Sequence, residues 1–255
     1  MLDSFNYVVI TCVISFVSLA LFLGIIAKWF IKRLPPRLID CIIIIFSLVG
    51  MYLYIPFHFF KTGFENEQPE KLQTAIKLSI NPYEKRICWN FLASIYAHDN
   101  FKQGIKDGNK AIEYMEKSIQ GEYEKYNLDT ALLGIWYSIK GDSQKVFELN
   151  SKVKNNLATR NIYIMNNEYD KAITTFNPEK QTLMHYLLAD LYKKTGKTKE
   201  YKEALTIADN VFNKNDKNCQ NEKCRTQIKI NKDRYLSVEN YKKWIEQQRK
   251  EYKFE

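Results

Sequence analysis

Glycine and proline are scarce in this sequence, with nine glycines and six prolines among 255 residues. β-Proteins rich in tight turns need both residue types at those turns. No stretch of the chain shows the sustained alternation of apolar and polar residues that marks a half-buried strand. Hydrophobic residues make up an ordinary 45% and aromatic residues a high 14%, which is enough to build a core. These features predict an all-α fold.

Residues that carry catalytic chemistry are also few. The chain has three histidines. We assign His58 to an aromatic stretch, His98 to a turn and His185 to an aromatic position of a helix. None of them fits a triad, no glycine-rich phosphate loop is present, and no carboxylate pair stands apart from the surface acids. The sequence therefore predicts no enzyme, no cofactor and no metal site.

Two long runs of the chain contain no charged residue. They cover residues 4–27 and 41–60. A membrane-spanning helix needs roughly 20 mostly apolar residues, so we expect a transmembrane helical hairpin over residues 1–62, with spans at about 5–27 and 41–60. The aromatic residues from Tyr52 to Phe60 are typical of a membrane–water interface. The alternative for the first run is a cleaved signal peptide, but only Asp3 precedes it and no basic segment does.

The loop between the two runs predicts the orientation of the hairpin. Its charged residues are four basic ones and one acid, namely Lys28, Lys32, Arg33, Arg37 and Asp40. Short loops with an excess of Lys and Arg stay on the cytoplasmic side. We therefore expect a bacterial inner-membrane protein with two spans, both termini extracytoplasmic and the large domain in the periplasm. Beyond residue 60 the chain carries 34 basic and 27 acidic residues, a net charge of +7. Both signs are interspersed there, so nucleic acid is not an expected partner.

A spacing of large and small apolar residues recurs between residues 70 and 210. Each copy has a leucine, a small residue beside it and a tyrosine three positions further on. The copies are Leu92-Ala93-Tyr96, Leu133-Gly134-Tyr137 and Leu188-Ala189-Tyr192, with a weaker one over residues 163–176. This pattern resembles the tetratricopeptide (TPR) repeat, in which pairs of antiparallel helices bury apolar surface by stacking.

The resemblance implies a TPR-like α-solenoid of helix-turn-helix repeats over residues 63–210. In that family the small residue lets the second helix of the same pair approach closely. The copies here start about 41, 26 and 29 residues apart, whereas the family's period is about 34 residues. The third copy has Thr159-Arg160 where a leucine and a small residue are expected. A helical bundle without repeats is therefore the alternative.

In TPR proteins the first helices of the pairs line a concave groove that binds peptides or helices of a partner. Carried over to this chain, the resemblance implies candidate groove residues on three of the copies. They are Asn90, Ser94, Ile135, Ser138, Tyr186, Asp190 and Lys193. Amide and ammonium groups suit a peptide backbone or carboxylate, and Tyr and Ile suit side chains. The alternative is that these positions are ordinary solvated surface.

We assign residues 211–255 to a C-terminal helical cap. Residues 213–218 are polar and are expected to form a loop, with a helix following at about 222–234. Ser237 is a candidate N-cap for a last helix, which would close the end of the array as open repeat stacks require.

Five cysteines are present. Cys219 and Cys224 have four residues between them and polar surroundings. We expect a disulfide there, because extracytoplasmic compartments are oxidising. A metal site is the weaker alternative, since no histidine lies near and no second cysteine pair exists. Cys88, beside Trp89, is expected to be a small buried hydrophobe.

Together these features predict a membrane-anchored extracytoplasmic scaffold that binds a protein or peptide partner in the cell envelope and contacts the lipid bilayer through two spans. The layout is also similar to a cytochrome c maturation family with two N-terminal spans and an outer TPR domain that binds apoprotein tails. That family has a much longer cytoplasmic loop. A non-catalytic accessory of an envelope glycan enzyme is a third possibility.

The predicted topology has a direct test. A reporter that is active only outside the cytoplasm, fused after Glu255, should be active, because the basic loop holds the other side of the hairpin in the cytoplasm. The matched control is a reporter that is active only inside the cytoplasm, which should stay silent at the same position. The opposite pair of results would overturn the topology.

Overall fold

The computed structural model describes residues 55–97, 105–177, 179–180 and 182–254. The chain divides between Ile55 and Pro56 into two compact units. Apart from Ile55, the described residues belong to the second unit. The first predicted span, the basic loop and most of the second span lie outside the described residues. Within the described ranges, no helix combines the length and the apolar character needed to cross a membrane.

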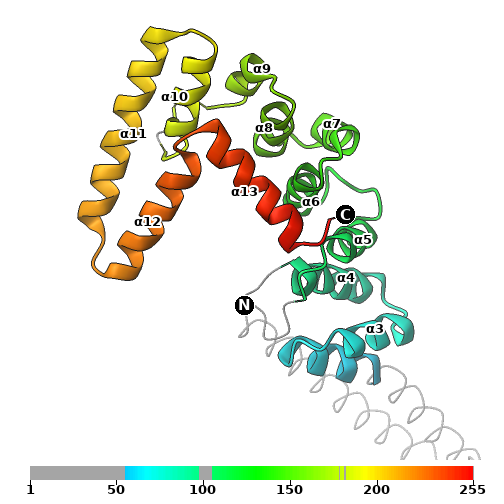
Figure 1. Cartoon of the computed structure of the whole chain (residues 1–255). Helices are drawn as coiled ribbons and strands as arrows, with labels where there is room; N and C mark the ends of the chain where they lie inside the picture. The colour runs from blue at the N-terminus through cyan, green and yellow to red at the C-terminus, as the bar shows by residue number, and fades with distance from the viewer. Residues whose placement is uncertain (1–54, 98–104, 178, 181, 255) are drawn as a thin grey trace, which may run out of the picture. The chain divides into compact units, whose positions relative to one another are not determined.

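Helices are the regular elements of the described residues, and no strand occurs among them (Figure 1). A helical stretch over residues 55–65 comes first. It is followed by α3 (Pro69–Leu78), α4 (Pro82–Ala97), α5 (Gly108–Ile119), α6 (Asn127–Lys140), α7 (Ser143–Lys152), α8 (Asn156–Met165), α9 (Tyr169–Thr174), α10 (His185–Lys194), α11 (Thr198–Asn218), α12 (Glu222–Tyr235) and α13 (Val238–Glu251). The predicted all-α class is confirmed for this part of the chain.

The helices form consecutive antiparallel pairs. α4 packs on α5, α6 on α7, α8 on α9 and α10 on α11. The turn within the second pair shows how such a pair is made. Gly141 ends α6 in the left-handed conformation with φ of 92°, and its amide donates to the Tyr137 carbonyl. Asp142 then caps α7 by accepting from the Lys145 amide.

Side-chain caps begin five of these helices. Asp107, Asp142, Asn155, Asn221 and Ser237 each accept a hydrogen bond from a backbone amide in the first turn. Those amides have no partner inside the helix, so each cap stabilises the helix start. The cap expected at Ser237 is confirmed.

The small residue of the second pair has a different neighbour from the one expected. A Cβ added at Gly134 would lie 3.1 Å from Asn155 Nδ2 and 3.7 Å from the Cβ of Ala158. Asn155 caps α8 and Ala158 lies within it, and α8 is the first helix of the next pair. The small residue therefore lets successive pairs approach each other, rather than the two helices of one pair.

The helical domain begins earlier than expected. Phe60 is 7% exposed and belongs to the largest buried cluster, and the rings of Phe64 and Phe91 lie 4.4 Å apart. The chain is helical as far as Glu65, past the boundary that the sequence predicts between residues 62 and 63. The compact unit that contains these helices begins at Pro56, because the last aromatic residues of the second run pack into its core.

Two expectations for the tail and the first pair need correction. The loop expected at residues 213–218 is wrong, since α11 continues through Asn218. Asn and Asp disfavour helix interiors, but α11 packs on α12, and a disulfide ties its C-cap residue to the first turn of α12. Phe101 and Gly104 also favour a second helix of the first pair that starts there; both lie outside the described residues, but residues 105–107 are not helical and α5 begins at Gly108.

The last helix does not cap the end of the array. α13 packs on α6, α8 and α10, the first helices of three successive pairs, and Figure 1 shows it crossing all three. α12 packs on α10 and α11 and takes the place beside the last pair. The prediction of a terminal cap is therefore wrong for α13. Its apolar side packs on the side of the array that α6, α8 and α10 form, and not on the end of the array.

Gly108 tests how the C-terminal tail is held. A Cβ at this position would lie 2.2 Å from Cζ of Phe254, so Gly108→Ala displaces the phenyl ring. We expect Gly108→Ala and Phe254→Ala each to lower the free energy of unfolding by about 2 kcal/mol, which is typical for burial of a large apolar side chain. The double variant should lose little more than either single variant, because both remove the same contact. Urea unfolding measures all three, and strictly additive losses would contradict the contact.

Candidate protein-binding surface

The first helices α6, α8 and α10 share one side of the array, which we call the inner face. α13 lies on this face and packs on all three helices. Its apolar anchors are Val238, Tyr241 and Ile245, spaced three and four residues apart and at most 1% exposed. This spacing places them on one side of a helix. The inner face therefore already binds an amphipathic helix, and that helix comes from the same chain.

The start of α13 is held by a carboxylate of the inner face. Oδ2 of Asp190 accepts a hydrogen bond of 2.8 Å from the Val238 amide, the first residue of α13. Amides in the first turn have no partner inside the helix, and a negative charge there is stabilised by the helix dipole. Beside this contact, the Lys194 ammonium pairs with Glu239 at 2.7 Å. Asp190 therefore caps the chain's own helix.

The middle of α13 is held by a buried chain of three polar side chains. The Tyr241 hydroxyl donates to Oδ1 of Asn161 at 2.7 Å, and Nδ2 of Asn161 donates to the Ser138 hydroxyl at 2.9 Å. The Ser138 hydroxyl donates in turn to the Ile135 carbonyl at 2.7 Å. Burial raises the pKa of the Tyr241 phenol, so it remains a protonated donor. Every member of the chain is satisfied, which is what makes polar burial stable.

The end of α13 and the residues after it are tied to α5 and α6. Nε of Arg249 donates to the Ile139 carbonyl at 2.8 Å, and the Gly108 amide donates to the Tyr252 carbonyl at 2.7 Å. Phe254 then packs in the largest buried cluster at 6% exposure. The whole C-terminal segment is thus bonded along its length to earlier helices.

The structure corrects the predicted groove at three positions. Ser138 is completely buried beneath α13. The Asp190 carboxylate accepts a hydrogen bond from the Val238 amide, the first amide of α13. Tyr186 is 3% exposed, and its hydroxyl donates to Asp209 of α11 at 2.6 Å. These three side chains are not open to a partner, because this chain already occupies their hydrogen-bonding groups.

The other four candidates are not brought together. Asn90 and Ser94 are half-buried on α4, where Nδ2 of Asn90 lies 3.8 Å from the Met115 sulfur and the Ser94 hydroxyl donates to the Asn90 carbonyl. Ile135 is half-buried against the largest cluster. Lys193 is exposed on α10, at the opposite end of the array from α4 (Figure 1).

Sequence reasoning missed Asn161 and Arg160, which stand where the third copy departs from the repeat pattern. Arg160 is 6% exposed. Its Nε and Nη2 donate to the hydroxyl and carbonyl of Thr175 at 2.9 and 2.8 Å, and its guanidinium stacks 3.7 Å from the Phe176 ring. Desolvation lowers the pKa of this guanidinium. The signal in the sequence was the polar residues themselves, which stand where the repeat pattern has apolar ones. Polar side chains at such buried positions need hydrogen-bond partners.

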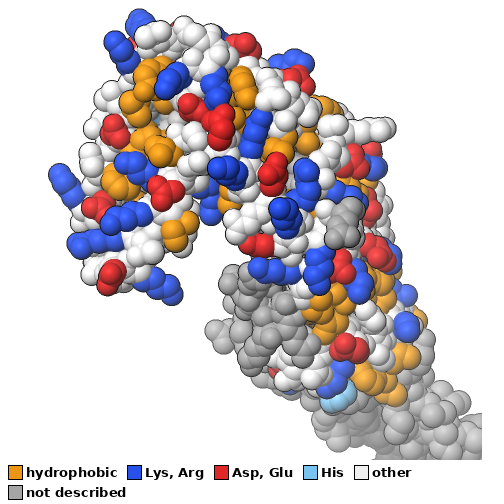
Figure 2. All heavy atoms as spheres, viewed as in Figure 1, with side chains coloured by type: hydrophobic (Ala, Val, Ile, Leu, Met, Phe, Trp, Pro, Cys, Tyr) orange, Lys and Arg blue, Asp and Glu red, His pale blue; other side chains and the backbone are white. Residues whose placement is uncertain are grey.

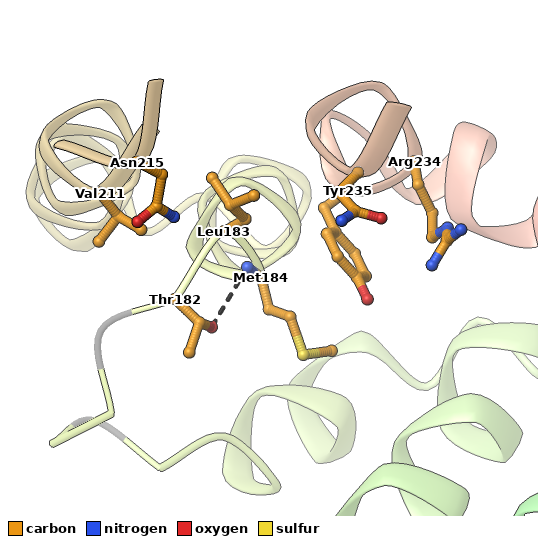
Figure 3. Close-up of a pocket in the computed structure, with 8 residues that line it drawn as sticks. Thr182, Leu183, Met184, Val211, Asn215, Arg234 and Tyr235 are labelled. Carbon is orange, nitrogen blue, oxygen red and sulfur yellow. Dashed lines mark hydrogen bonds between the residues drawn. The ribbon is translucent and has the colours of Figure 1, made fainter. Parts of the chain in front are cut away.

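A separate pocket of about 530 Å³ lies between the start of α10 and the helices α11 and α12 (Figure 3). Its lining residues are Thr182, Leu183, Met184, Val211, Asn215, Asn231, Arg234 and Tyr235. They include no histidine, cysteine or carboxylate. The Arg234 guanidinium lies 5.8 Å from the Tyr235 ring and 4.6 Å from the Trp244 ring of α13. This arginine braces α12 against α13.

The cysteines of the described residues fall into two kinds. Cys219 and Cys224 form a disulfide with their Cα atoms 5.6 Å apart, joining the end of α11 to the first turn of α12. Cys88 is free and 1% exposed, and burial, with a smaller effect of Glu84, raises the pKa of its thiol to about 12. No group of three or more His, Cys, Asp or Glu residues suited to a metal ion occurs in the described part of the chain.

The buried chain through Asn161 gives a test of how α13 is held. Tyr241→Phe keeps the ring but leaves Oδ1 of Asn161 without its donor, and a buried unsatisfied polar group costs about 1–3 kcal/mol. We expect the free energy of unfolding to fall by that amount in urea denaturation. Tyr192→Phe is the control, because the Tyr192 hydroxyl makes no hydrogen bond among the described residues. Equal effects of the two variants would contradict the role of the Tyr241 hydroxyl.

The arrangement of the helix pairs, with a helix of the same chain on their inner face, has been defined above without reference to other proteins. Comparisons of the chain with protein-family models, curated proteins and solved structures gave no match. The function is therefore inferred from the chemistry of the described surfaces.

Proposed function

We propose that this protein is a membrane-anchored extracytoplasmic scaffold of TPR-like helix pairs that recruits a protein partner in the bacterial cell envelope. One observation carries the proposal: the described helix pairs present a cluster of arginine and tyrosine beside an exposed leucine at the start of α6. Arrays of helix pairs bind partners through extended surfaces. The anchor rests on the charge-free runs and the basic loop of the sequence. The proposal assigns the protein a binding role and no catalytic step.

In this proposal α13 stays in place when the partner binds. Releasing it would expose the buried anchors Val238, Tyr241 and Ile245. It would also leave the inner-face groups that hold α13 without their present partners. Both effects oppose release, because burying apolar surface and pairing buried polar groups stabilise the domain. The partner therefore binds a surface that α13 leaves open.

A cluster at the start of α6 has the composition of such a surface. The Arg86 guanidinium lies 4.4 Å from the Tyr126 ring and 5.6 Å from the Tyr83 ring, and Nη1 lies 3.8 Å from the Asp129 carboxylate. Nε of Arg86 is buried without a hydrogen-bond partner. Leu128 stands beside this cluster with 82% of its surface exposed. Tyrosine and arginine dominate the energetic centres of protein interfaces.

Capture from membranes tests the proposal. We expect full-length protein, crosslinked in membranes and purified, to bring down a specific envelope protein, and Leu128→Glu to reduce that capture about tenfold, equivalent to 1.4 kcal/mol. Phe147→Glu is the matched control, because Phe147 is also an exposed large apolar residue, at 40%, on α7, the other helix of the same pair. Capture that is unchanged by Leu128→Glu, or reduced equally by the control, would remove the surface assignment. Recovery of haem-protein precursors would favour the cytochrome c maturation alternative.

A further inference from the structure

The helical stretch that ends at Glu65 and helix α3 run antiparallel, with Gly63 beside Leu72. A Cβ at Gly63 would lie 2.9 Å from Cγ of Leu72, and the turn between the stretches is closed by a hydrogen bond from the Gln68 amide to the Gly63 carbonyl. Both stretches rise by about 1.5 Å per residue. Pro56, seven residues before Gly63, therefore lies near the level of Ser79, which directly follows the last residue of α3. The turn after α3 thus lies at the end of the domain where the chain enters it.

Apolar side chains are exposed at this end. Ile80 is 65% exposed, Tyr83 62% and Leu78 38%. We call these three residues the entry rim. Figure 2 shows hydrophobic side chains at the α3 end of the domain, and others among basic and acidic side chains over the rest of this face. A gathered set of exposed large apolar residues marks an interaction surface.

The charge beside the entry rim is positive. Lys77 is exposed and Lys85 half-buried, and neither ammonium has an ion pair among the described residues. The nearby acid is already engaged, because the Ser79 hydroxyl donates to Oε2 of Glu84 at 2.6 Å. The rim therefore offers apolar and tyrosine side chains flanked by free ammonium groups. This is the composition of protein surfaces at the lipid headgroup layer, where tyrosine sits and lysine reaches phosphate.

We propose that the entry rim contacts the headgroup layer of the lipid bilayer. The inference rests on the proposed membrane anchor, since the charge-free run over residues 41–54 directly precedes Ile55. A span that ends there delivers the rim to the membrane surface. The contact limits the tilt of the domain, because the turn after α3 touches the bilayer in addition to the chain entry.

Photocrosslinking of the full-length protein tests this contact. The photoreactive residue p-benzoylphenylalanine is placed separately at position 80, at position 83, at position 44 within the apolar run and at position 147 on α7. Each variant is reconstituted in nanodiscs of phosphatidylethanolamine and phosphatidylglycerol. We expect lipid adducts, detected by mass spectrometry, at positions 44, 80 and 83 and none at position 147. Lys77→Gln with Lys85→Gln should reduce the adducts at position 80, and Lys193→Gln should not.

The outcomes separate this inference from the anchor itself. Adducts at position 44 without adducts at positions 80 and 83 would overturn the entry-rim contact and leave the anchor standing. Adducts of position 80 to protein in place of lipid would overturn it in favour of a protein interface or a second copy of the chain. Absence of lipid adducts at position 44 would overturn the proposed anchor, and with it the rim contact.

Discussion

The packing of α13 across the inner face is the interaction on which the helical domain depends. Tyr241 and Ile245 fill the space between α8 and α10 in the second buried cluster, and Phe254 continues into the largest one. The two clusters are thereby tied together by one segment. A helix pair buries its apolar side only against a neighbour, and here part of that cover comes from the chain's own C-terminus.

This packing also explains why the third helix pair departs from the repeat pattern. Its first helix carries Arg160 and Asn161 at buried positions. Asn161 bonds both Ser138 of the preceding pair and Tyr241 of α13, so one amide joins three helices. Arg160 closes the turn at Thr175 after α9. An apolar residue in place of Asn161 would lose those directional bonds, so the departure from the repeat pattern at Asn161 is coupled to the presence of α13.

With the inner face filled, the open surfaces of the domain differ in chemistry. The Arg86 cluster combines tyrosine, arginine and an exposed leucine beside a carboxylate, which suits a protein partner. The entry rim combines isoleucine, leucine and tyrosine beside two lysines that have no ion pair among the described residues, which suits lipid headgroups. The two surfaces meet at Tyr83, whose ring lies 5.6 Å from the Arg86 guanidinium. In the proposed function the entry rim orients the domain at the membrane, and the part of the Arg86 cluster around Tyr126 and Leu128 recruits the partner.

The sequence by itself determined what depends on neighbours a few residues away. The helix pairs, the Ser237 cap and the buried Cys88 follow from local periodicity and capping chemistry. The tertiary structure decided which surface each helix meets. The spacing of Val238, Tyr241 and Ile245 predicts a helix with one apolar side, but it does not predict which helices that side contacts. The hydrogen bonds that hold α13 join residues 48 and 80 positions apart in the sequence. Likewise, the apolar character of Phe60 fits both a membrane span and a protein core, and only the structure places it in the core. A local sequence pattern predicts that a side chain is buried, whereas only the tertiary structure shows which residues it is buried against.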